Sequence, residues 1–102
     1  MRSILQPSRK SFAEDAVYGS VKVGALSGRA AIMDAFRAYF DTYPDQVAID
    51  ELVEQVSPNA ARAVWRLTAT DARSGAPLVR RGEETITFDA AGRIVRVDVT
   101  DY

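Results

Sequence analysis

Two acidic side chains stand at positions where strand alternation turns them toward an apolar face. Glu84 alternates in step with Ile86, and Asp101 alternates in step with Val99. Because every second side chain of a strand points to the same face, both carboxyl groups are predicted to enter or border the core. A buried carboxyl group favours its neutral form or needs a donor. The pair is therefore a candidate general acid and general base.

Each of these carboxyl groups also has a structural interpretation. Glu84 could lie at a bulge or strand edge and form an ion pair with Arg62, Arg66 or Arg80. Asp101 stands next to the last residue of the sequence, where water could solvate it. The residues themselves leave both interpretations open.

Histidine and cysteine are absent from the sequence. Their absence excludes a Ser-His-Asp triad, a Cys-His pair and a zinc motif of the HExxH type within the chain. Proton transfer near neutral pH must then use Asp, Glu, Tyr or Lys with shifted pKa values, or else a partner or a bound water. No cofactor and no metal are implied.

Length and composition are those of one soluble domain, with 102 residues of which 47% are apolar and 26% charged. The net charge of −1 argues against nucleic acid as the main partner. Arg80 and Arg81 form the only dense basic spot, and we expect them at a solvated strand edge or turn. No apolar run approaches the ~18 residues that indicate a membrane span, and residues 1–10 lack the apolar stretch of a secretory signal. A cytoplasmic location without membrane contact is expected.

The spacing of apolar residues predicts one long helix over about residues 28–43. Ser27 is the expected N-cap, and Pro44 ends the helix because it displaces the preceding residue from the α region. Tyr39 is expected to serve in packing or in an interface. The apolar stripe, at spacings of three and four, comprises Ile32, Met33, Phe36, Phe40 and Tyr43.

Strand-like segments dominate the rest of the chain. Short turns join the last four of them, which predicts an antiparallel meander, and a helix followed by a run of strands indicates an α+β fold. We expect strands at about 46–56, 61–70, 78–88 and 93–101. Ahead of the helix we expect a loose tail (1–7), the last turns of a helix (8–13), a short strand (16–20) and a loop (21–27).

Four segments together resemble the SnoaL-like group of the nuclear-transport-factor-2-like superfamily, over about Phe12 to Tyr102. The resemblance implies a cone, in which a curved mixed or antiparallel sheet wraps on one long helix around a pocket. It also implies a single domain over residues 1–102, with 1–11 as a tail or helix remnant, and a homodimer formed through the outer sheet face. The segments are FAEDAVYGS, LSGRAAIMDAFRAYFDTYPD, AVWRLTAT and GEETITFDAAGRIVRVDVTDY.

The resemblance also assigns expected roles. Glu84 matches the position where the steroid isomerases have a protonated Asp that donates to an oxyanion, and Asp101 lies near the acid/base Asp of related cyclases. Ser20 takes the place of the isomerases' Asp base, which argues against steroid isomerisation because serine cannot act as that base. Tyr18 and Ser20 share a strand face and are expected to contact a substrate. Trp65 is a further substrate-binding candidate, although core filling suits it well.

The family usually has a long helix before the segment that matches Phe12, whereas only residues 1–11 precede it here. A divergent minimal cone and a truncated reading frame both remain open. So do three functions. The first is an enzyme that acts on a small apolar molecule with a carbonyl, hydroxyl or epoxide, using Glu84 and Asp101 as acid and base. The others are a non-catalytic domain that binds such a ligand, and a dimerisation module whose pocket is vestigial.

Overall fold

One helix and six strands make up the part of the chain that this computed structural model describes, residues 11–20 and 24–102. The expected tail over residues 1–7 lies outside the described residues. In chain order the elements are β1 (Phe12–Ser20), β2 (Gly24–Ser27), α1 (Arg29–Thr42), β3 (Val47–Ser57), β4 (Ala60–Thr70), β5 (Pro77–Phe88) and β6 (Ile94–Asp101).

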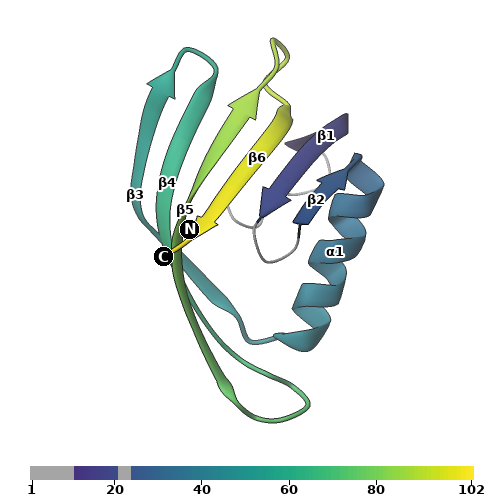
Figure 1. The fold of residues 1–102 in the computed structure, drawn as a ribbon, viewed down its shortest axis with the longest axis vertical. Helices are drawn as coiled ribbons and strands as arrows, with labels where there is room; N and C mark the ends of the chain where they lie inside the picture. The colour runs from purple at the N-terminus through teal and green to yellow at the C-terminus, as the bar shows by residue number, and fades with distance from the viewer. Residues whose placement is uncertain (1–10, 21–23) are drawn as a thin grey trace.

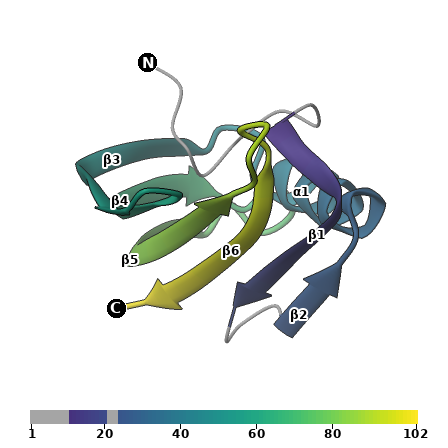
Figure 2. The same cartoon turned by 90° about the horizontal axis from the view of Figure 1, so that it is seen from above.

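The strands form a single sheet in the order β2-β1-β6-β5-β4-β3. β1 runs parallel to β6, and every other neighbouring pair is antiparallel. The sheet curves strongly, and α1 lies on its concave side against β1 and β2 (Figures 1 and 2). The predicted α+β class, a curved mixed sheet wrapped on one helix, is confirmed. No helix in the described residues is long and apolar enough to cross a membrane.

The apolar stripe of α1 faces the sheet as its spacing predicted. Ile32 is fully buried, and the ring of Phe36 packs edge-on against Phe12 and Tyr18, with centroids 6.0 and 5.6 Å apart. Such edge-to-face pairs suit the charge distribution of aromatic rings. The helix is therefore held by burial of one face.

The start of α1 differs from the prediction of Ser27 as N-cap. The N-cap is Gly28, with φ 93° and no side-chain capping bond, a backbone conformation that glycine adopts without steric cost. Its N–H donates to the carbonyl of Ala16 at 2.8 Å. Pairing of this backbone group with β1 replaces the expected serine cap and fixes the helix start on the sheet.

The strands before α1 are more extensive than predicted. Residues 12 and 13, expected at a helix end, belong to β1, and residues 8–10 lie outside the described part. Phe12 pairs with Ile94 of β6 and is fully buried. Residues 24–27, expected in a loop, form β2 along β1, while 21–23 lie outside the described part. In both places sheet pairing outweighs weak local strand propensity.

The meander from β3 to β6 follows the prediction to within a few residues. β4 and β5 pair without a register shift, whereas β5 and β6 shift between Thr87 and Phe88. Cα partners across neighbouring strands share a face of the sheet. Two such rows position the site, Ala63–Glu84–Val99 and Trp65–Gly82–Asp101.

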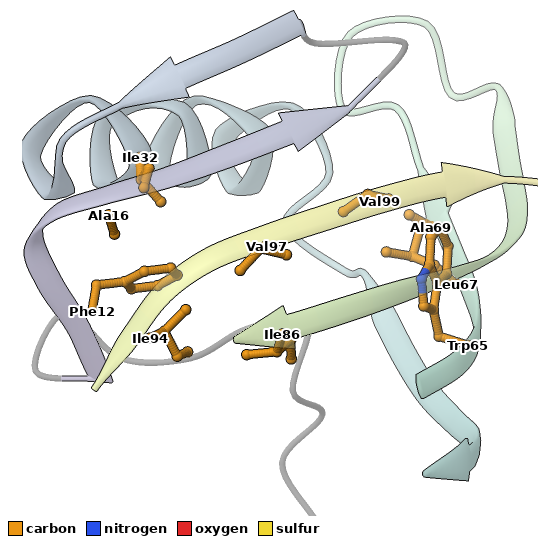
Figure 3. Packing of buried hydrophobic residues seen from close by; sticks show 10 residues of the cluster. All are labelled: Phe12, Ala16, Ile32, Trp65, Leu67, Ala69, Ile86, Ile94, Val97 and Val99. Carbon is orange, nitrogen blue, oxygen red and sulfur yellow. The ribbon is translucent and has the colours of Figure 1, made fainter. Parts of the chain in front are cut away.

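The buried apolar residues line the concave side of the sheet from end to end. Figure 3 shows Phe12 and Ile94 near one end and Trp65 and Leu67 near the other, with Val97 between them. Among the described residues Glu84 is the only charged or polar side chain in the buried class, with 1% of it exposed. The core is thus apolar apart from one carboxyl group.

Candidate functional site

A pocket of about 110 Å³ opens on the concave face between α1 and the sheet. Phe36, Phe40 and Leu67 contribute to its apolar wall. A mostly apolar hollow with a few polar groups is the usual form of a small-molecule site. The polar side chains at its wall are Tyr18, Ser20, Tyr39, Gln46 and Arg80.

The three predicted substrate-binding residues meet at this pocket. Tyr18 and Ser20 reach it from β1, and Trp65 reaches it from β4. Burial raises the pKa of Tyr18, and the charge of Glu84 contributes in the same direction. The Tyr18 hydroxyl therefore stays protonated and can donate a hydrogen bond at neutral pH.

Trp65 serves both the core and the pocket wall. Its side chain is 1% exposed, and its Nε1–H has no hydrogen-bond partner among the described residues. A buried donor without an acceptor costs about 1–3 kcal/mol, and most native proteins avoid such groups. This indole N–H is therefore available to an acceptor brought by a ligand.

Arg80 is the centre of the polar end of the pocket. Its Nη2 donates to both carboxylate oxygens of Asp101, at 2.8 and 3.1 Å, and its Nη1 donates to the Tyr39 hydroxyl at 2.8 Å. The guanidinium also lies 5.2 Å from the ring centroid of Trp65, within cation–π range. Burial opposes the charge of Arg80, but the hydrogen bonds to Asp101 and Tyr39 outweigh it and raise the guanidinium pKa.

The expectation that both members of Arg80-Arg81 are solvated is wrong for Arg80. The Arg80 side chain is only 18% exposed, whereas that of Arg81 is 56% exposed and reaches Glu51 at 3.4 Å. Alternation along β5 places Arg80 on the inner face with Gly82 and sends Arg81 to the outer face. Two adjacent arginines thus have opposite environments.

Gly82 makes room for this arrangement. It lies between Trp65 and Asp101 in the cross-strand row. A Cβ at this position would approach Trp65 Cζ2 to 2.8 Å and would also collide with the carbonyl oxygen of Thr100. The missing side chain therefore lets the indole ring lie over β5, where Arg80 stacks on it.

Glu84 points to the inner face as predicted. Its Oε1 is buried and has no hydrogen-bond partner among the described residues. Arg62 pairs with Glu83 and Glu54 on the other face, so it does not compensate Glu84. Burial, and then the charge of Asp50, raise the Glu84 pKa to about 8. At neutral pH this carboxyl group is mostly protonated.

The two predicted catalytic carboxyl groups lie on the same face of neighbouring strands but in different states. Glu84 lies beside Val99, which lines the pocket, while both oxygens of Asp101 accept from Arg80. Neither carboxyl group is part of the pocket wall itself. The structure thus brings the pair to the back of the pocket, and their roles as acid and base stay predictions.

Three pocket residues were not among the predicted site residues. Arg80 shares strand parity with Glu84, and Tyr39 lies three residues after Phe36 on the helix stripe, so periodicity carried a signal for both. Gln46 follows the helix end and carried none. Among residues 11–20 and 24–102, no three acidic side chains are grouped so that they could hold a metal ion.

The sequence profile of the SnoaL-like domain matches residues 9–97. The chain belongs to the SnoaL-like family. The match extends from the N-terminal side of β1 into β6 and covers most pocket residues of this SnoaL-like domain. No curated protein matches its sequence.

Solved structures share the fold of this SnoaL-like domain at low sequence identity. An NTF2-like protein of unknown function from Exiguobacterium sp. 255-15 superposes with a TM-score of 0.81 at 15% identity, over 92% of this chain and 79% of that one. A putative SnoaL-like polyketide cyclase from Jannaschia sp. CCS1 gives 0.80 at 15%, over 91% and 68%. SalBIII, an epoxide hydrolase/cyclase-like enzyme of salinomycin pyran-ring formation, gives 0.80 at 14%, over 92% and 74%. At these identities the likeness shows the cone fold alone.

Proposed function

We propose that this SnoaL-like domain binds a small, mostly apolar molecule that carries a carbonyl, hydroxyl or epoxide oxygen. The observation that carries the proposal is the apolar pocket with a polar end, where Arg80 and Tyr39 meet beside the unpaired indole N–H of Trp65. An apolar body with one oxygen function matches that distribution. The cyclase and epoxide hydrolase/cyclase-like neighbours support the same ligand class.

A pocket-filling variant tests the binding proposal. Ala35 lines the pocket from α1, whereas Ala38 is exposed on the same helix. Thermal melts with a panel of aromatic ketones, alcohols and epoxides should show ligand-dependent stabilisation of the wild-type protein. Ala35→Phe should abolish the stabilisation and Ala38→Phe should keep it. A panel that never shifts the wild-type melting temperature would contradict the proposal.

Acid-base catalysis on the bound molecule is the further step of this proposal. A carboxyl group with a pKa near 8, like that of Glu84, can donate a proton at neutral pH, as a general acid must. Asp101 would orient Arg80 in the resting site and act as a base once one of its oxygens is released. Tyr18 and Ser20 would orient the substrate.

Two variants separate catalysis from binding alone. Glu84→Gln and Asp101→Asn should fold and bind ligand but lose turnover of a substrate found in the panel. Unchanged turnover in both variants would remove the catalytic step. Engagement of both Asp101 oxygens favours the second candidate, a non-catalytic binding domain, which predicts ligand-dependent stabilisation with no turnover of any bound compound.

A further inference from the structure

Charges at the pocket compensate one another. Among the described residues that line the pocket, Arg80 alone carries a charge. That charge is matched by Asp101, whose carboxylate it holds at 2.8 and 3.1 Å. Behind the wall, Glu84 is mostly neutral at pH 7, and the charge of Asp50 acts on it. An incoming anion therefore meets no uncompensated positive charge, and Asp50 adds repulsion.

The polar groups at the pocket are short of acceptors. Trp65 Nε1 and Arg80 Nε are both buried and have no hydrogen-bond partner among the described residues. Neither an indole nor a guanidinium can accept a hydrogen bond. Buried donors are nearly always paired in folded proteins, so the complementary ligand is one that brings an acceptor.

We propose that the pocket selects neutral molecules whose oxygen accepts hydrogen bonds, such as a ketone, an ester or an epoxide, over ionised molecules of the same size. This inference rests on the proposed binding function and names its ligand class. A carboxylate would lose its hydration without a free cation to replace it. An ammonium group would face Arg80 and a set of donors to which it cannot donate. A neutral carbonyl group meets neither penalty.

Three probes of one shape test the selectivity. Acetophenone is neutral, benzoate is anionic, and 1-phenylethylamine is cationic at pH 7, and all three carry one phenyl ring. Their dissociation constants for the wild-type protein are measured by calorimetry at pH 7 and fixed ionic strength. Acetophenone should bind at least about tenfold more tightly than either ion.

One substitution should convert the preference. Asp101→Asn keeps the size of the side chain and removes the charge that compensates Arg80, so benzoate binding should strengthen by about tenfold. Acetophenone binding should change by less than about threefold. The matched control is Asp98→Asn on the same strand, because Asp98 pairs with Arg96 away from the pocket. It should leave all three constants unchanged.

The outcomes divide clearly. Benzoate or the amine binding the wild type as tightly as acetophenone would overturn the selectivity while leaving the pocket function in place. Failure of Asp101→Asn to gain benzoate affinity, in a variant whose melt shows it folded, would overturn it as well. If that variant does not fold, the wild-type comparison alone decides. Binding of none of the three probes to the wild type would count against both proposals.

Discussion

Arg80 Nη2 donates to both carboxylate oxygens of Asp101, so that a single nitrogen joins β5 to β6 at the polar end of the pocket. Both side chains are only 18% exposed. In such surroundings an ion pair is screened less than on the surface, and removal of one partner leaves the other poorly solvated. The pair should therefore contribute to stability in a way that exposed pairs of this chain do not.

A double-mutant cycle measures that contribution. With Arg80→Gln, Asp101→Asn and the double variant, urea unfolding should give a coupling free energy of about 1–2 kcal/mol. The control cycle uses Arg37 and Asp34 on α1, which are 3.2 Å apart with side chains more than 70% exposed. Its coupling should be several-fold smaller. Equal couplings would show that the pocket does not strengthen the pair.

Glu84 should make stability depend on pH in an unusual direction. Its folded pKa of about 8 lies above its ordinary value of 4.5. Between these values the folded state keeps a proton that the unfolded state loses, so the free energy of unfolding falls as pH rises. Glu84→Gln removes this effect. Its unfolding free energy relative to wild type should therefore rise by up to about 1.4 kcal/mol per pH unit from pH 5 to 8.

The control for this titration is Glu83→Gln. Glu83 is the adjacent residue, but it faces the other side of the sheet and pairs with Arg62. Urea titrations of both variants across the same pH range should show the rise for Glu84→Gln only. A flat difference for Glu84→Gln would mean that its carboxyl group titrates near the ordinary value.

Gly82→Ala should disturb the indole ring above it. The new methyl group would lie 2.8 Å from Trp65 Cζ2, and overpacking of this kind typically costs about 1–3 kcal/mol. Because Trp65 is the only tryptophan, its fluorescence spectrum should shift as well. Gly19→Ala is the matched strand control, since its nearest neighbour would be Asp98 Oδ1 at an ordinary 3.6 Å. A spectrum unchanged by Gly82→Ala would contradict the arrangement.

Homodimerisation through the outer sheet face is a further expectation. Ile49 on β3 is 48% exposed and pairs with Arg66, whose side chain faces outward, while Val53 is 55% exposed and pairs with the inward-facing Ala63. Sedimentation velocity at micromolar concentration should show dimers. Ile49→Lys should dissociate them, because it places a charge in the apolar contact, and Val53→Lys should not. A monomer in the wild type would refute the expectation.

Alternation within strands allowed much of this site to be predicted. It placed Glu84 inward and assigned Tyr18 and Ser20 to one face, and the structure agrees on both. The same rule applied to Arg80, but its neighbour Arg81 made the pair resemble a solvated turn. Partner identity was the missing information, since the contact with Asp101 joins residues 21 positions apart.

Prediction was weakest ahead of the helix. β2 has four residues, including Gly24, and too little local pattern to distinguish it from a loop. β1 shifts register between Phe12 and Val17, so its alternation is interrupted where Glu14 and Asp15 are exposed. These segments become strands through pairing with distant or adjoining backbone, which local sequence does not encode.

The parallel pairing of β1 with β6 has a consequence for biosynthesis. Apart from the short β2, the only neighbour of β1 in the sheet is the last strand to be synthesised. A nascent chain therefore cannot close the cone until residue 101 has left the ribosome, and β1 with its aromatic side chains must wait unsheltered. Such sequence-distant contacts slow folding, so this interval is when chaperone capture or misassembly would compete with the native state.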